Sequence, residues 1–474
     1  MIASRRARPA VQANQPSPHL AAAARLWRQD TQGAGLVTTM LWMVIFIMII
    51  PQGLDYAGLN GMPSSSDALS KFVWLFLLGG SAGAIAWKRQ RATKLLKYVN
   101  PFLIGFLFLA LASFAWSIQP AITMRRVIRA ATVIMVCYTF VLLAWDQNRF
   151  QSLLRTILTT VMVASALFVL VAPDMAIHQA DQPELKDAWR GITLGKNALG
   201  PLSSICVILW AHGYFSKQVP TFKALMGVGV AALCLIGSRS ATSLLTTVFG
   251  LVFLTIVIRA PKSYRRYMPY LIGLFAAVII VYALAVLRIV PGSEILLKPI
   301  AMITGKDLTF TGRTAIWEIL NKQIRLHPFL GSGYCAYWIG ATPESPSFEM
   351  LTTLYFYPSE GHNGYLDVIN DLGTIGGVCL LGYFFSYIKQ ALQLMKTDRP
   401  QASLYLTFIF CAFLQNMSES YWFNCLGVHF VLMTLATTSL ARSALDAQLK
   451  DGIAATARAV SVPNVSRGRL AHRP

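Results

Sequence analysis

Long apolar runs alternate with short polar segments along most of this 474-residue chain. Each run has enough residues to cross the roughly 30 Å hydrocarbon core of a bilayer as a helix. The pattern predicts about twelve membrane spans, near 36–52, 71–87, 99–117, 127–145, 152–172, 197–215, 222–237, 240–258, 267–288, 366–388, 402–417 and 422–441. The predicted fold class is therefore an all-α polytopic integral membrane protein.

A long polar segment interrupts this pattern between predicted spans 9 and 10. From Gly312 to Leu326, isoleucine and leucine recur at helical spacing, while charged and amide side chains occupy the other face. Pro328 ends the pattern because proline lacks a backbone donor and disfavours helical geometry at the preceding residue. The segment is predicted to carry an amphipathic helix that either lies on the outer leaflet or caps the bundle.

These patterns divide the chain into five parts. They are a disordered basic cytoplasmic tail at 1–35, spans 1–9 at 36–288, a periplasmic loop with the amphipathic helix at 289–365, spans 10–12 at 366–441, and a basic cytoplasmic tail at 442–474. The first part has no early apolar core followed by a cleavage site, which favours a tail over a signal peptide.

Composition supports the membrane class. Hydrophobic residues make up 55% of the chain and charged residues 13%, against about 25% charged in soluble domains. The net charge of +21 is spread through short loops, so it does not indicate a nucleic-acid partner. Six of the 7 cysteines lie in apolar runs and only Cys335 lies in the long loop, so no disulfide framework is indicated.

The distribution of positive charge predicts the orientation. Most of the 41 lysines and arginines fall on one side when successive segments are assigned alternately. Cytoplasmic loops carry this excess in membrane proteins. Both termini are therefore expected in the cytoplasm and the long loop outside it.

Several arginines run against this bias because they lie near the outer ends of spans. Arg190 in WRGITLGKN and Arg239 in GSRSA are the main pair. Guanidinium groups bind phosphate oxygens bidentately and stay charged near a bilayer, so the two could clamp a pyrophosphate. Alternatively each reaches lipid headgroups or helix-end carbonyls. Arg313 could join the clamp, and the group at 125, 126 and 129 is interpreted as interfacial anchors.

His362 is the candidate catalytic residue. It stands in GHNG just before span 10, where Gly361 and Gly364 permit a tight turn. Imidazole, with an ordinary pKa of about 6.5, suits a general base that takes the proton from an attacking sugar hydroxyl. The alternative is a histidine that caps the next helix or faces water. Glu360, Asp367 and Glu419 are the acidic residues that could orient the ring, and the sequence does not choose among them.

Familiar cofactor motifs are missing from the sequence. GITLGKN departs from the phosphate-binding loop of nucleotide-binding proteins in its spacing and in Asn197. No aspartate-rich or His/Cys metal-ligand pattern is present in the predicted outer segments. We therefore expect neither a cofactor nor a metal.

With these residues in place, the chain resembles the O-antigen ligase/polymerase superfamily, that is, Wzy-like membrane glycan polymerases, and especially the exopolysaccharide polymerases. The resemblance is strongest from about Trp189 to Gly377. It rests on WRGITLGKNALG, GSRSA, GRTAIWEILNKQIRLHPFLGSGY and HNGYLDVINDLGTIGG.

The resemblance implies a metal-independent enzyme of the bacterial inner membrane that joins glycans carried on polyprenyl pyrophosphate. By this resemblance, Arg190 and Arg239 match the arginines that engage the pyrophosphate, Arg313 the arginine that opens the loop helix, and His362 the base that activates the acceptor hydroxyl. A chain-length regulator and an export complex are further partners that it implies.

Three other functions stay open. A ligase would transfer a finished glycan to lipid A core or another acceptor. A transporter or flippase would place ionisable residues at span centres, which are nearly free of charge here. A non-catalytic scaffold would not need His362.

Overall fold

The computed structural model describes residues 32–50, 68–145, 149–179, 185–261 and 313–461, together with the single residues 267, 270 and 273. Predicted span 9 lies outside the described residues except for these three positions. Most of the predicted N-terminal tail, the loop before residue 313 and the chain after residue 461 also lie outside them.

Within the described ranges the secondary structure is helical, apart from one isolated bridge between Ile177 and Trp189. The helices are α2 (Ala34–Ile49), α3 (Ala68–Trp87), α4 (Arg89–Leu96), α5 (Pro101–Ala112), η2 (Ser113–Ala115), α6 (Pro120–Leu143), α7 (Arg149–Val171), α8 (Pro173–Ala176), α9 (Lys196–Phe215), α10 (Thr221–Gly237), α11 (Ala241–Arg259), α14 (Arg313–Leu326), α15 (Phe348–Leu354), α16 (Gly364–Leu394), α17 (Arg399–Gln415) and α18 (Val428–Ser461).

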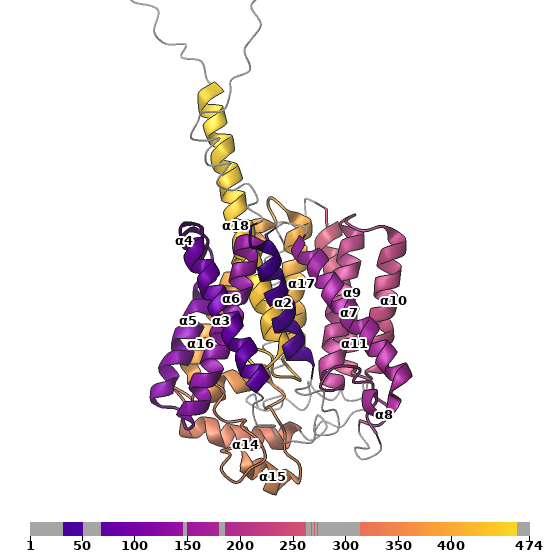
Figure 1. Cartoon of the computed structure of the whole chain (residues 1–474), viewed down its shortest axis with the longest axis vertical. Coiled ribbons are helices and arrows are strands. Elements are labelled where there is room, and N and C mark those ends of the chain that lie inside the picture. Colours follow the sequence, from indigo (N-terminus) through magenta and orange to yellow (C-terminus); the bar gives the residue numbers. More distant parts are fainter. Residues whose placement is uncertain are drawn as a thin grey trace, which may run out of the picture.

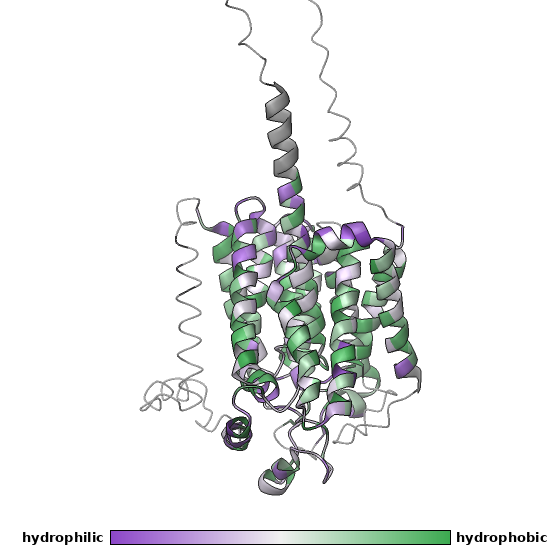
Figure 2. Ribbon diagram, turned by 90° about the vertical axis from the view of Figure 1, so that its left-hand side faces the viewer, coloured by the Kyte–Doolittle hydropathy of each residue, from purple (hydrophilic) through white to green (hydrophobic). Residues whose placement is uncertain are grey.

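The long helices form one bundle and run up and down between its two ends (Figure 1). The short helices α8, α14 and α15 lie at the lower end, whereas α4 lies at the upper end. The described chain starts at the upper end with α2 and leaves it at the same end with α18. Figure 2 shows apolar residues along the middle of the helices and polar residues at both ends, as expected for helices that cross a bilayer.

Six helices among the described residues are long and apolar enough to cross a membrane, or seven if the bent pair of α4 and α5 counts as one span. Shorter apolar helices are α2, α3 from Lys71, and α10. The protein is thus a multi-pass membrane protein, and the count of about twelve spans stays a prediction. α18 begins at Val428 rather than near residue 422, because 416–427 folds as a loop at the lower end.

The predicted loop helix is present as α14. Its apolar face buries Ile316, Trp317, Ile319 and Leu320 against the start of α16 and the α15 segment. The indole of Trp317 donates to the carbonyl of Gly361 over 2.8 Å. The helix therefore packs directly beneath the turn that carries His362.

A break in α16 docks the end of the long loop. Gly373 has φ 64° and ψ −166°, which interrupts the helix. The carbonyls freed before the break accept hydrogen bonds from the amides of Ser332 and Gly333, at 2.8 and 2.9 Å. The amides freed after it donate to the carbonyls of Pro328 and Phe329, at 2.9 and 3.3 Å. The segment HPFLGSG thus satisfies the backbone groups that the helix leaves unpaired.

Candidate functional site

The turn that carries His362 is held from both sides. Asn363 begins α16, and its side-chain oxygen accepts from the amides of Tyr365 and Leu366 at 3.1 and 3.2 Å. The amide of Gly364 donates to the carbonyls of Asn416 and Glu419, both at 3.0 Å. A Cβ at Gly364 would lie 2.0 Å from the Asn416 side chain. Only glycine therefore lets the 416–427 loop approach this closely.

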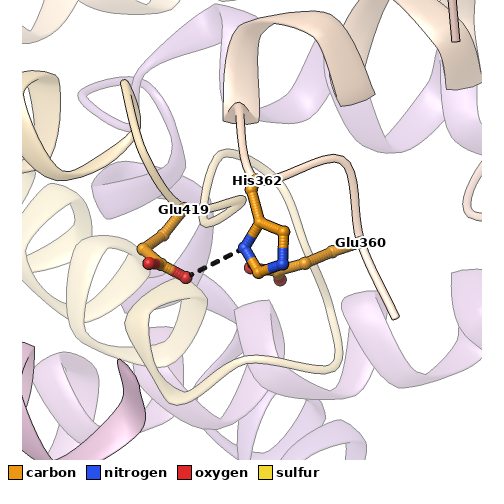
Figure 3. A group of neighbouring side chains, drawn as sticks. All are labelled: Glu360, His362 and Glu419. Atoms are coloured by element: carbon orange, nitrogen blue, oxygen red, sulfur yellow. Dashed lines mark ion pairs between the residues drawn. The ribbon is translucent and has the colours of Figure 1, made fainter. Parts of the chain in front are cut away.

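Two carboxylates meet one nitrogen of the imidazole. His362 Nδ1 lies 3.4 Å from Glu360 Oε1 and 3.4 Å from Glu419 Oε2 (Figure 3). The Glu419 side chain is 9% exposed, while those of His362 and Glu360 are 22% and 21% exposed. The carboxylates hold the ring by Nδ1, which leaves Nε2 as the nitrogen that can take a proton from a substrate.

Arg313 belongs to the same group of charges. Its Nη2 lies 3.0 Å from Glu419 Oε1, so one carboxylate bridges the arginine and the histidine. The Arg313 side chain is 19% exposed. A half-buried guanidinium balances the negative charge that Glu419 brings into this poorly solvated region. We call Arg313, Glu360, His362 and Glu419 the histidine cluster.

The acidic residues that flank His362 in sequence have different roles. Glu360 contacts the ring, whereas Asp367 accepts hydrogen bonds from Trp338 Nε1 and from the amide of Gly361, both at 2.9 Å. Asp367 therefore supports the turn rather than the imidazole. The loop 416–427 supplies the second carboxylate, which the sequence offered only as one of three candidates.

The charges of the cluster change its protonation. Burial disfavours the imidazolium, but the nearby carboxylates of Glu360 and Glu419 outweigh it and raise the pKa of His362 to about 9. Burial raises the pKa of Glu360, although His362 opposes that shift. The resting site therefore favours a protonated histidine between its carboxylates at neutral pH.

The other two predicted arginines lie together on a second segment at the lower end of the bundle. Arg190 Nε donates to the carbonyl of Met175 at 2.5 Å. Arg239 Nη1 lies 3.6 Å from Asp187 Oδ2 and 3.2 Å from the carbonyl of Lys186, with its side chain 60% exposed. We call 173–179 and 185–195, with the turn at Gly237–Ser240, the arginine segment.

Close packing joins the parts of the arginine segment. The amide of Trp189 donates to the carbonyl of Gly237 at 2.8 Å. A Cβ at Gly237 would lie 2.4 Å from the Trp189 indole. Arg190 and Arg239 thus lie on chain stretches held against one another, while Arg313 stands apart from them in the histidine cluster.

One hydrogen bond connects the two groups. Tyr421 in the 416–427 loop donates its hydroxyl to the carbonyl of Asn197, at the start of α9, over 2.9 Å. Asn197 closes the stretch WRGITLGKN, which also contains Arg190, so we count residues 196 and 197 as part of the arginine segment. The loop therefore bridges the histidine cluster and the arginine segment.

Arg126 differs from its interpretation as an interfacial anchor. Its guanidinium donates to the carbonyls of Cys335 and Trp338, the latter at 2.9 Å. It therefore fixes the long loop on α6. No local sequence pattern indicates this contact, because the two carbonyls come from residues about 210 positions away.

Glu360, His362 and Glu419 also have a spacing that could hold a metal ion, since one ligand atom from each lies within 4.8 Å of the others. Two carboxylates and one imidazole suit several divalent ions. Arg313 already offers a positive charge to Glu419. A cation would have to compete with this contact.

Two comparisons bear on these residues. Residues 226–381 match the family model described as O-antigen ligase. That range contains Arg239, Arg313 and His362 and ends before Glu419. An exopolysaccharide production protein, ExoQ of Rhizobium meliloti (strain 1021), is 26% identical over 322 residues, which cover 64% of this chain and 68% of that protein.

Proposed function

We propose that this chain is a member of the O-antigen ligase/Wzy-like superfamily, as both comparisons support, and that it polymerises polyprenyl-pyrophosphate-linked oligosaccharides into exopolysaccharide or O-antigen. The observation that carries the proposal is the histidine cluster at one polar end of a membrane bundle, bridged by the 416–427 loop to the arginine segment. The name of the ExoQ relative favours an exopolysaccharide product.

In the proposed reaction an acceptor hydroxyl attacks the anomeric carbon of the donor sugar. The bond between that carbon and the acceptor oxygen forms while its bond to the pyrophosphate oxygen breaks, so one displacement predicts inversion. The hydroxyl proton passes to Nε2 of His362, and Glu360 and Glu419 stabilise the resulting imidazolium. General-base help of this kind is worth about 10² to 10⁴ in rate.

The leaving pyrophosphate carries the negative charge that develops. Arg190 and Arg239 are the proposed partners for its oxygens, because bidentate contacts between guanidinium and phosphate are short and strong. The Arg239 side chain is 60% exposed and its contact with Asp187 is 3.6 Å long, so it is accessible to a ligand. Arg313 is committed to Glu419, so its proposed role is to hold that carboxylate and, through it, the imidazole.

A ligase is the second candidate, because the description of the matching family model names one. It would use the same donor and the same cluster but deliver the glycan to lipid A core or another acceptor. Further parts of the proposal are a bacterial inner-membrane location, cytoplasmic termini, metal independence, and assembly with a chain-length regulator and an export complex.

The deciding experiment measures polymer length in a strain that lacks this protein. The strain is complemented with wild type, with His362→Ala, or with His327→Ala as the matched control, all at equal membrane levels. His327 is an exposed histidine at the end of α14, outside the histidine cluster. Long chains are expected with wild type and His327→Ala, and single repeat units with His362→Ala.

Other outcomes separate the alternatives. Full-length polymer that is not attached to its acceptor in the His362→Ala strain would indicate the ligase. Long chains restored by His362→Ala would overturn a catalytic role and favour a scaffold. Adding EDTA to purified enzyme tests metal independence, since a metal held by Glu360, His362 and Glu419 would be stripped and activity lost.

A further inference from the structure

A cavity of about 40 Å³ lies beside the histidine cluster, where four parts of the chain meet. One buried water needs roughly 10 to 15 Å³ on this measure, so the cavity has room for about three water molecules. This volume is too small for a whole sugar ring and large enough for one arm of a sugar. The cavity borders Glu360, one of the two carboxylates that contact His362.

The lining of the cavity combines aromatic and polar groups. Trp338 and Trp422 contribute their rings, and Ser420 contributes a hydroxyl. Aromatic side chains with a few polar groups among them are the usual lining of a small-molecule site.

Charge limits what the cavity can accept. Three carboxyl groups line it, those of Glu360, Asp367 and Asp371, against the single guanidinium of Arg126. Asp371 is only 8% exposed, and its carboxylate accepts from the amide of Cys335 at 2.8 Å. Carboxyl groups thus outnumber the one guanidinium in the lining. A hydroxyl is the better match for such a lining, because it can donate to a carboxylate and accept from a protonated carboxyl group or a guanidinium, whereas an anion finds only Arg126 as a charged partner there.

The 416–427 loop borders the cavity and also binds α9. Ser420 and Trp422 line the cavity, and Tyr421 donates to the carbonyl of Asn197. In the proposed function the anionic donor group binds Arg190 and Arg239, which leaves the cavity beside Glu360 for the acceptor.

We propose that this cavity is the subsite for a neutral, hydroxyl-bearing arm of the acceptor sugar, such as a hydroxymethyl group, and that it excludes acidic sugars from that position. The subsite rests on the proposed function for its place in the reaction. Seating one arm of the acceptor here would hold a neighbouring hydroxyl against His362.

Ligand-observed NMR on the full-length protein in lipid nanodiscs tests the subsite without any need for turnover. The probes are methyl β-glucoside and methyl β-glucuronide, which differ only in a hydroxymethyl group and a carboxylate. Saturation transfer to the glucoside is expected with wild type, and little or none to the glucuronide. Equal or stronger transfer to the glucuronide would overturn the proposal.

Variants locate the binding. Ser359 is exposed and lines the cavity, so Ser359→Trp is expected to block it and abolish transfer to the glucoside without disturbing the core. Thr353→Trp adds the same bulk at an exposed position of α15 that does not line the cavity, and should bind like wild type. Transfer that persists in Ser359→Trp at the wild-type level would disprove the subsite.

The two proposals fail separately. If glucoside binding behaves as expected while His362→Ala still polymerises, the proposed function is wrong and the subsite stands. If polymerisation requires His362 while Ser359→Trp leaves glucoside binding at the wild-type level, the subsite is wrong and the proposed function stands.

Discussion

His362 is defined by what surrounds Nδ1. Two carboxylates at 3.4 Å turn an ordinary imidazole into a stronger base, with a pKa near 9, and Arg313 keeps one of those carboxylates in place at 3.0 Å. A stronger base is less often in its neutral form. Because the pKa of about 9 lies two units above pH 7, about one His362 in a hundred is neutral at that pH. Base strength and availability therefore oppose each other in this site.

That opposition predicts the pH profile of the reaction. Only neutral His362 can take the acceptor proton, so kcat/KM should rise with pH, reach half of its maximum near pH 9 and level off above that. Removing the charge of Glu360 by Glu360→Gln should lower the pKa of His362 and move the rising limb toward lower pH. Initial rates with purified lipid-linked repeat units give the profile, and a limb that stays in place would contradict the assignment.

The same shift predicts a pH-dependent stability. The pKa of His362 is raised from 6.5 to about 9 in the folded protein, so the ion pairs stabilise it fully below about pH 6.5 and are lost as the pH rises through about 9. The contribution is about 3 kcal/mol at most, from 1.36 kcal/mol per pKa unit. Thermal unfolding in detergent should show wild type more stable than His362→Gln at pH 6.5, with the difference gone by pH 10. A constant difference would count against the ion pairs.

Residue-level chemistry was only partly readable in the sequence. The motif GHNG before an apolar run indicated His362 as the candidate. A neighbouring acidic residue is needed to raise the pKa of a histidine. Three acidic residues qualified, because Glu360 and Asp367 flank His362 in the sequence and Glu419 lies in the last predicted outer turn. The choice depends on the turn at Gly361 and Gly364 and on a loop that returns more than fifty residues later, which no local pattern encodes.

At the scale of elements, the break in α16 links the long loop to the membrane bundle. Gly331 approaches the backbone of Asp371 so closely that a Cβ would lie 2.4 Å away, and Gly373 meets Phe329 in the same way at 2.2 Å. These two glycines explain why HPFLGSG and DLGTIGG occur together in this chain. α14 leads directly into HPFLGSG, and the turn that carries His362 leads directly into α16. The geometry of the junction between HPFLGSG and α16 therefore positions both α14 and this turn.

Gly373→Ala is expected to be strongly destabilising. An added Cβ would collide with the Phe329 backbone, and φ 64° with ψ −166° is open essentially only to glycine. The cost is roughly 3 kcal/mol or more, with loss of the protein from the membrane. Gly377→Ala, one turn further along α16, meets its nearest neighbour at 3.5 Å and is the control. Quantitative immunoblots of membrane fractions measure the amount of each variant. Equal amounts of the two variants would show that the break in α16 is not required.

Helix bounds followed from the hydrophobic pattern where a run ended in polar residues or proline, as at α10, α11 and α14. The pattern failed before α18, because Trp422, Phe423 and Cys425 continue the apolar run although they belong to a loop. These side chains are buried among α5, α16 and α17, so their apolarity reflects packing inside the protein rather than contact with lipid.

At the scale of the whole molecule, the bundle has two unlike ends. One end holds the starting point of α2, the helix α4 and the last turns of α18, and the other holds the histidine cluster, the arginine segment and α14. Substrates that reach the cluster must therefore arrive on the side opposite to the two ends of the described chain.

Reporter fusions test which side this is. Alkaline phosphatase fused after Ser345, between α14 and α15, is expected to be active, because that enzyme folds only outside the cytoplasm. The same reporter fused after Lys396, between α16 and α17 at the other end, is expected to be inactive. The reverse result would put the proposed site in the cytoplasm and exclude an extracytoplasmic polymerase.

The late position of Glu419 has a consequence for how the protein is made. His362 and Arg313 leave the ribosome before the segment that joins them, and Glu419 follows in the last connection before α18. A chain that stalls or is cut short after α16 carries the histidine without the loop that tunes it and ties it to Asn197. Synthesis thus completes the histidine cluster only when almost the whole polypeptide has been made, so an unfinished copy lacks the full set of its contacts.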